Sequence, residues 1–211
     1  MLGLSHRPFH VVALGDSTTA GTPGWKSPIE APPEGEGDVT SQYAWWLLQE
    51  RPGWVVLNRG VNRETSAQIA ARFERDVLAH SPDAVVIIAG VNDVYGGQPA
   101  SDVIEQLRGM YDRARSHGIH VVAGTIIPYN TATPDQNARM REVNDWIRNT
   151  AADATGLSFV DTRAAAALPD DPDRLCASPD ELHPSPEGYR RMAMALLPAL
   201  DKLARAAEPL P

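Results

Sequence analysis

Five short runs of apolar and mainly β-branched residues constrain the fold of this chain more than any other feature of its sequence. They occupy residues 10–14 (HVVAL), 54–57 (WVVL), 84–89 (AVVIIA), 120–125 (HVVAGT) and 157–161 (LSFVD). Most of these runs lack the alternation of polar and apolar residues that a half-exposed strand shows, so they are typical of strands buried on both faces. The sequence therefore predicts a parallel sheet at the centre of the protein.

Segments with helical periodicity lie between the predicted strands. We expect helices at residues 41–51, 65–80, 100–117 and 134–155, and a last one from residue 186 to about 206. In the last segment Ser185 is the expected N-cap and Pro186 the first helical residue, and Pro198 predicts a kink or an early end. The alternation of strands and helices indicates a doubly wound α/β sandwich, in which ligands bind beyond the carboxyl ends of the strands.

Composition limits the domain organisation and the possible partners. A chain of 211 residues fits a single domain spanning residues 1–211. A formal net charge of −8 argues against nucleic acid as a partner, and no apolar run approaches the length of a membrane span. The single cysteine, Cys176, excludes an intramolecular disulfide, and the first ten residues show no secretion signal. We therefore expect a cytoplasmic protein, with a secreted form that has lost its signal as the alternative. Nothing in the sequence indicates the oligomeric state.

Three residues with chemically useful groups follow directly after predicted strands. Ser17 comes after the first strand in the sequence Gly15-Asp16-Ser17, Gly60 follows the second strand, and Asn92 ends the third. Each has an ordinary structural interpretation when taken alone: a helix N-cap for Ser17, a turn for Gly60 and an Asx turn for Asn92. Because the carboxyl ends of parallel strands meet at one edge of a sheet, we expect all three residues at the same crevice.

A fourth candidate is the sequence DELHP at residues 180–184, just before the last predicted helix. The spacing of three residues lets Asp180 and His183 direct their side chains to one side, so that the carboxylate orients the imidazole as a base. Pro184 disfavours helical geometry at His183 and keeps the pair on a loop. An exposed Asp and His beside an N-cap would give the same sequence, so the joint occurrence of the four features is what indicates acyl transfer to a serine.

The order Ser, Gly, Asn and Asp-x-x-His resembles that of the SGNH, or GDSL-type, hydrolase superfamily. The similarity covers nearly the whole chain, from GDST at residue 15 through NRGVNRET at residue 58 and GVND at residue 90 to DELHP at residue 180. It implies a flavodoxin-like, three-layer α/β/α fold with a five-stranded parallel sheet of strand order 2-1-3-4-5. It also implies an esterase, lipase or acylhydrolase that needs no cofactor and acts on a small-molecule ester or thioester.

The resemblance further implies roles for individual residues. Ser17 is the expected nucleophile, and Asp180 and His183 are expected to complete a catalytic triad with it. The N–H groups of Ser17 and Gly60 and the side chain of Asn92 are the expected oxyanion donors. No metal site is expected, because the remaining histidines are not clustered at the spacing of metal ligands.

Three features bear on the substrate and leave it open. Arg63 stands where the superfamily often has a small residue such as glycine, and it either narrows the acyl site or places a cation beside it. Trp25 and Tyr129 lie in expected rim loops, where they favour a short-acyl or aryl ester if they do not simply serve packing. The long segment 21–40 is expected to be either a substrate lid or a floppy loop.

A non-catalytic module that binds a phosphate or another ligand fits the same topology. The hydroxyl-rich sequence STTAGT at residues 17–22 is similar to the flavin-phosphate loop of flavodoxins, but its glycine is misplaced for that motif. This alternative also leaves Asp180 and His183 without a role. The sequence therefore favours the hydrolase.

Overall fold

Five parallel strands form the central sheet of the computed structural model, which describes residues 7–207. The strands are β1 (His10–Gly15), β4 (Val55–Gly60), β5 (Ala84–Ile88), β6 (His120–Gly124) and β7 (Leu157–Val160). Their spatial order is β4-β1-β5-β6-β7, and every neighbouring pair is parallel. The five predicted strands and the predicted order 2-1-3-4-5 are thus confirmed.

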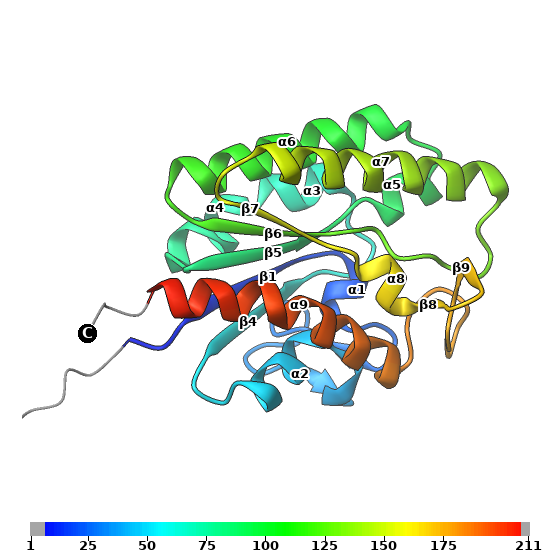
Figure 1. The fold of residues 1–211 in the computed structure, drawn as a ribbon. Helices are drawn as coiled ribbons and strands as arrows, with labels where there is room; N and C mark the ends of the chain where they lie inside the picture. Colours follow the sequence, from blue (N-terminus) through cyan, green and yellow to red (C-terminus); the bar gives the residue numbers. More distant parts are fainter. Residues whose placement is uncertain (1–6, 208–211) are drawn as a thin grey trace, which may run out of the picture.

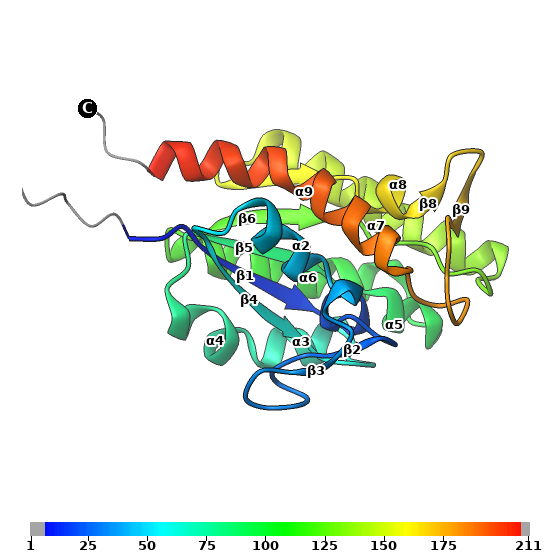
Figure 2. The same cartoon turned by 90° about the horizontal axis from the view of Figure 1, so that it is seen from below.

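Helices cover both faces of this sheet and make three layers (Figure 1). One layer holds α3 (Ser66–Ala71), α4 (Phe73–Asp76), α5 (Val91–Tyr95), α6 (Ala100–Ser116) and α7 (Pro134–Asp153). The other holds α2 (Tyr43–Glu50) and α9 (Pro186–Ala207), with α8 (Thr162–Ala166) packed beside α9. Figure 2 shows α9 lying along the sheet on this second face.

The strand sequences explain why both faces are covered. Alternate residues of a strand point to opposite faces, and here both sets are apolar and buried. One set of side chains faces α3, α6 and α7, and it includes Val12, Leu14, Val85 and Ile87. The other set faces α2 and α9, and it includes Val11, Ala13, Val86 and Ile88. The absence of polar alternation in the sequence therefore reflects two separate hydrophobic cores, one on each side of the sheet.

The prediction of one continuous helix at residues 65–80 is wrong. It is divided into α3, α4 and a 3-10 turn at Leu78–His80, and the first break lies at Arg72. The guanidinium of Arg72 is buried and donates to the carbonyl oxygens of Gly15 and Arg59 at 2.9 and 2.8 Å. A surface helix would have left this side chain in solvent, whereas here tertiary hydrogen bonds draw it inward.

The last helix has the predicted span, and of the two outcomes expected at Pro198, a kink or an early end, the structure contradicts the early end. Helix α9 continues through this residue to Ala207, so an early end did not occur. Pro198 is exposed, and water can therefore hydrate the carbonyl of Met194 that loses its intrahelical partner. At the other end, Ser185 is the N-cap as predicted, because its Oγ accepts the N–H of Gly188 at 3.3 Å.

The long segment at residues 21–40 packs against the edge of the sheet. It contains two short antiparallel strands, β2 (Trp25–Lys26) and β3 (Glu36–Gly37). Its Ser27 Oγ donates to the Gly60 carbonyl at 2.6 Å, and its Glu30 carboxylate accepts the N–H of Asn62 at 2.9 Å. Hydrogen bonds therefore hold the segment beside β4, and its Thr22 lines the cavity described below, so its role as a lid stays a prediction.

Short elements on the carboxyl side of the sheet complete the fold. Helix α1 (Ser17–Ala20) follows β1, a 3-10 turn occupies Val39–Ser41, and a second hairpin pairs β8 (Ala167–Leu168) with β9 (Asp171–Leu175). No helix within residues 7–207 is long and apolar enough to cross a membrane. Most of the stretch inspected for a secretion signal, residues 1–6, lies outside the described residues.

Candidate active site

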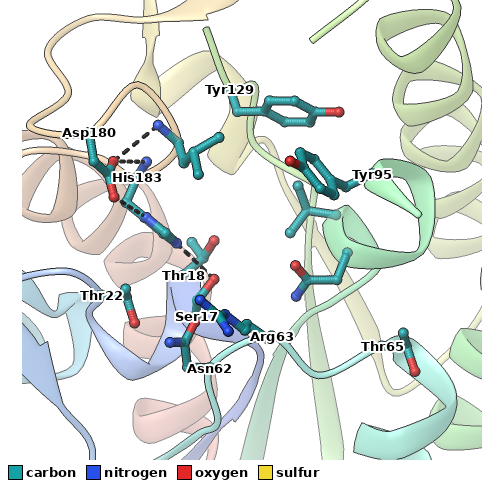
Figure 3. Close-up of a pocket in the computed structure, with 13 residues that line it drawn as sticks. Ser17, Thr18, Thr22, Asn62, Arg63, Thr65, Tyr95, Tyr129, Asp180 and His183 are labelled. Atoms are coloured by element: carbon teal, nitrogen blue, oxygen red, sulfur yellow. Dashed lines mark hydrogen bonds and ion pairs between the residues drawn. The ribbon is translucent and has the colours of Figure 1, made fainter. Parts of the chain in front are cut away.

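A cavity of about 590 Å³ opens where β1, β4 and β5 end, at the edge predicted from the topology (Figure 3). Four of the five predicted site residues line it. The full lining consists of Ser17, Thr18, Thr22, Asn62, Arg63, Thr65, Val91, Asn92, Tyr95, Tyr129, Asp180, Leu182 and His183.

Ser17 is the first residue of the short helix α1. The preceding Asp16 caps this helix, its Oδ1 accepting the N–H of Thr18 at 2.9 Å, and the helix ends at Gly21 in the left-handed conformation. Because the first N–H groups of a helix have no intrahelical acceptor, the Ser17 N–H is left for another partner. Burial raises the pKa of the Asp16 carboxyl to about 7, against the opposing effect of the Thr18 hydrogen bonds.

Asp180 and His183 meet Ser17 across the cavity, although 166 residues separate Ser17 from His183. The imidazole Nε2 lies 2.9 Å from Ser17 Oγ, and the other ring nitrogen, Nδ1, lies 2.7 Å from Asp180 Oδ2. Figure 3 shows the three side chains joined in one line. An imidazole that donates from Nδ1 to a carboxylate presents an acceptor at Nε2, as a base for the serine hydroxyl requires.

Local hydrogen bonds fix the Asp180 carboxylate. Its Oδ1 accepts the backbone N–H groups of Leu182 and His183 at 3.0 and 2.8 Å. Burial alone raises the pKa of this carboxyl, but the hydrogen bonds from the His183 ring and from the two N–H groups outweigh it, so the pKa lies below its usual value. Asp180 therefore remains a carboxylate at neutral pH.

Asn130, which the sequence analysis did not single out, supports the loop that carries this pair. Its N–H donates to the carbonyl oxygen of Glu181 at 2.7 Å, and its side-chain oxygen accepts the N–H of Leu175 at 2.8 Å. Glu181 has a φ of 64°, a left-handed conformation that is unfavourable for this residue type. The β6–α7 connection thus helps to hold an unfavourable turn between Asp180 and His183.

Gly60 is not in the cavity, and its predicted role as an oxyanion donor is wrong. Its N–H donates to Asn58 Oδ1 at 2.9 Å, and the residue is buried at the end of β4. A Cβ at this position would lie 2.0 Å from the backbone nitrogen of Ala20. The close approach that requires glycine here is therefore that of helix α1, not that of a substrate.

Arg63, three residues further along, lines the cavity instead. Its φ of 64° places it in the left-handed region, which costs an L-residue about 1 kcal/mol. Among residues 7–207, no acceptor is hydrogen-bonded to the Arg63 N–H. A residue that lines the cavity thus has a backbone N–H without an acceptor, and the sequence analysis considered this residue only for its side chain.

Asn92 lies in α5 and lines the cavity as predicted. Its side-chain Nδ2 donates to the carbonyl oxygen of Glu64 at 2.9 Å, which leaves its second amide proton for another acceptor. The next residue, Asp93, accepts hydrogen bonds from the N–H and Oγ of Ser66 at 2.8 and 2.7 Å. Two neighbouring residues of α5 therefore anchor the loop that contains Arg63.

Arg72 also anchors the loop that contains Arg63. Its Nε donates to the Glu64 carboxylate at 2.6 Å, while another of its nitrogens bonds the Gly15 carbonyl at the end of β1. The side chain of Arg72 is only 7% exposed. This buried guanidinium consequently connects the strand that leads to Ser17 with the loop that carries Arg63.

Two tyrosines form the wall opposite Asp180 and His183 (Figure 3). The rings of Tyr95 and Tyr129 are 5.8 Å apart, with Tyr95 largely exposed and Tyr129 buried. The Tyr129 hydroxyl has no hydrogen-bond partner among the described residues. The expected rim position is thus correct for Tyr129, whereas Trp25 is buried and does not line the cavity.

No group of three or more His, Cys, Asp or Glu side chains in the described part of the chain is arranged to hold a metal ion. The chemically active groups of the cavity are a hydroxyl, an imidazole, a carboxylate and several N–H donors. A hydroxyl bonded to an imidazole that a carboxylate orients is the arrangement found in hydrolases with a nucleophilic serine.

Comparisons with known proteins agree with this class. The family model described as the GDSL-like lipase/acylhydrolase family matches residues 13–191, so the chain belongs to this family. An acetylxylan esterase from Geobacillus stearothermophilus is 29% identical over 200 residues, which cover 79% of this chain and 85% of the relative. The chain is accordingly an ester-bond hydrolase and not the ligand-binding module considered as the alternative.

Solved structures show the same fold. An acetyl-xylooligosaccharide esterase from Geobacillus stearothermophilus has a TM-score of 0.69 and 25% identity, covering 90% of this chain and 93% of that chain. A GDSL-like lipase from Bacteroides thetaiotaomicron has a TM-score of 0.72 and 24% identity, covering 92% and 88%. The resemblance to the SGNH superfamily is therefore confirmed for both the family and the fold.

Proposed function

We propose that this chain hydrolyses carboxylic esters through a covalent acyl-enzyme on Ser17. The observation that carries the proposal is the continuous contact from Ser17 Oγ through the His183 ring to Asp180. His183 Nε2 takes the hydroxyl proton while Oγ attacks the ester carbonyl carbon, and the same proton then passes to the departing alcohol. Water then attacks the carbonyl carbon of the acyl-enzyme while His183 Nε2 takes its proton, and the acid is released as that proton returns to Ser17 Oγ. Thioesters undergo the same transfer.

Three N–H donors stabilise the negative oxygen of the tetrahedral intermediate in this proposal. They are the backbone N–H groups of Ser17 and Arg63 and the side-chain amide of Asn92. All three residues line the same cavity, and neither backbone N–H has another acceptor among the described residues. The Glu64 carbonyl holds the Asn92 amide in place before the substrate binds, so little reorganisation is needed during the reaction.

The substrate class that we propose is an acetyl or other short-acyl ester of a carbohydrate hydroxyl. Support comes from the acetylxylan esterase and the acetyl-xylooligosaccharide esterase described above. Catalytic mutants of the esterase from Geobacillus stearothermophilus have a serine or a histidine replaced by alanine. The exposed ring of Tyr95, whose centroid lies 5.8 Å from that of Tyr129, offers an apolar surface to a sugar.

The test combines active-site labelling with hydrolysis of p-nitrophenyl acetate. We expect a fluorophosphonate probe to label the parent protein at Ser17, and Ser17→Ala to lose both labelling and turnover. Ser101→Ala is the matched control, because Ser101 is exposed on α6 and outside the cavity. Turnover of the ester by folded Ser17→Ala at the parent rate would refute the proposal.

A further inference from the structure

The side chain of Arg63 has no role in the mechanism proposed above. It is exposed and lines the cavity that contains Ser17 (Figure 3). Among the described residues that line this cavity, Arg63 is the one permanent cation, and most of the others are neutral polar or aromatic side chains. Asp180 is the acidic member of the lining, and it pairs with His183. With His183 neutral, the formal charges of Arg63 and Asp180 cancel over the whole lining, but the guanidinium of Arg63 forms no ion pair with Asp180.

Two acidic residues near Arg63, its sequence neighbour Glu64 and the Glu30 that bonds the adjacent Asn62, already have other partners. Glu64 pairs with Arg72 at 2.6 Å, and Glu30 accepts the N–H groups of Asn62 and Ser27 at 2.9 and 3.3 Å. Within residues 7–207, no carboxylate forms an ion pair with Arg63. The guanidinium is thus available to an anion from solution.

The backbone makes this side chain unexpected. At a φ of 64° a glycine would adopt the loop conformation without strain, yet the chain has a long cationic residue there. The protein as a whole has a formal net charge of −8, which repels anions at a distance. A cation kept in an unfavourable conformation at the cavity points to a contact with the ligand.

We propose that Arg63 forms an anion subsite, which selects esters with a carboxylate or a phosphate group on the alcohol portion. This inference rests on the proposed ester hydrolysis with a short acyl group. An acetyl group has no position for a charge, so the anion belongs to the alcohol. A guanidinium binds both kinds of oxyanion through two parallel N–H donors, and the side chain of the adjacent Asn62, which also lines the cavity, offers neutral hydrogen bonds.

A pair of chromogenic acetates tests the subsite. The anionic member is 3-carboxy-4-nitrophenyl acetate, and the neutral member of similar shape is 3-carbamoyl-4-nitrophenyl acetate. The measured quantity is the ratio of kcat/KM for the anionic ester to kcat/KM for the neutral ester within each variant. Any change that a substitution causes at the Arg63 N–H affects both esters and cancels in this ratio.

We expect Arg63→Gln to lower the ratio about tenfold, mainly through KM, which corresponds to about 1.4 kcal/mol. Arg63→Lys is expected to restore part of the preference, and Arg63→Glu to reverse it. The preference of the parent protein should weaken as salt is added, because screening acts on an exposed charge. Arg63→Gly should lose the preference and gain thermal stability, since glycine removes the backbone strain.

Arg174→Gln is the matched control, because Arg174 is an exposed arginine of β9 outside the cavity. It changes the net charge equally and should leave the ratio unmoved. A ratio that is the same in the parent and in Arg63→Gln overturns the inference, even when both esters are hydrolysed. Replacing the carboxylate by a phosphate in a third ester determines which of the two anions binds better.

A binding measurement separates this inference from the proposed function. The ligand is the product 3-carboxy-4-nitrophenol, titrated calorimetrically into Ser17→Ala and into Ser17→Ala with Arg63→Gln. Weaker binding to the double variant supports the subsite even if the parent protein hydrolyses neither ester, in which case the proposed function alone fails. Equal binding to the two variants overturns the subsite.

Discussion

Replacing Asp180 with asparagine tests whether the carboxylate orients the base. The asparagine side chain has almost the same shape, and its oxygen can still accept the N–H groups of Leu182 and His183 that Asp180 Oδ1 accepts. Its amide group would then take the place of Oδ2 at 2.7 Å from His183 Nδ1. An amide donates a proton there, so the imidazole must accept at Nδ1 and carry its own proton on Nε2. That tautomer cannot accept the proton of Ser17.

The structure sets the size of the expected effect. A wrong tautomer at a fully buried triad lowers kcat about 10⁴-fold. Here the side chain of Asp180 is 31% exposed and that of His183 is 13% exposed. Solvent therefore screens part of the charge, while the effect on the tautomer remains. We expect kcat to fall about 10³-fold in Asp180→Asn, or about 4 kcal/mol in the activation free energy.

The assay is the steady-state hydrolysis of p-nitrophenyl acetate between pH 5 and 9, with circular dichroism as the check of folding. Asp170→Asn is the matched control, because Asp170 is exposed in the turn between β8 and β9 and lies outside the cavity. It should retain the kcat of the parent protein. If folded Asp180→Asn also keeps the parent kcat across this pH range, Asp180 does not orient His183.

Three further substitutions test other contacts. Gly60→Ala forces a methyl group against the backbone of α1 and should destabilise the fold by about 3 kcal/mol in urea unfolding. At Gly109 a Cβ would have no neighbour within 4 Å, so Gly109→Ala should stabilise α6 by up to about 1 kcal/mol. Asp16→Asn removes a carboxyl that the folded chain keeps protonated up to about pH 7. The folded state binds this proton more tightly than the unfolded state, so the free energy of unfolding of the parent falls as the pH rises from about 4 to about 7. In urea titrations at these two pH values, the decrease should be smaller in Asp16→Asn by up to about 4 kcal/mol. Arg72→Met should lower the free energy of unfolding by about 3 kcal/mol and also lower kcat. Arg75 pairs with the same Asp76 from an exposed position, so Arg75→Met should lower the free energy of unfolding by less than about 1 kcal/mol. Equal effects in either matched pair, or parallel pH profiles for Asp16→Asn and the parent, would contradict the corresponding argument.

The sheet could be predicted from the sequence because burial on both faces leaves a local signal. A run such as residues 11–14 can be predicted as a strand without knowing which elements pack against it, because each of its residues faces one hydrophobic core or the other. The positions of Ser17 and Asn92 followed from the same argument, because parallel strands end at one edge. The predicted meeting of Asp180 and His183 with Ser17 also agrees with the structure.

The errors concern residues whose partners are distant in the sequence. A glycine after a strand indicates a close approach but not what approaches, and at Gly60 it is the backbone of Ala20. Arg72 fits a helical pattern, and its acceptor at Gly15, 57 residues away, has no local signature. The left-handed conformation of Arg63 is equally hidden, because arginine does not favour it.

The long sequence separation between Ser17 and His183, the proposed nucleophile and base, has a consequence for biosynthesis. Ser17 directly follows the first strand and is made early, whereas His183 belongs to the loop that precedes α9, 166 residues further along the chain. Under that proposal, a nascent chain that has not yet reached residue 183 lacks the base for Ser17. Under the proposed mechanism, hydrolytic activity therefore requires that both ends of the domain have folded together, and chains synthesised only through the first strands hold a serine without its base.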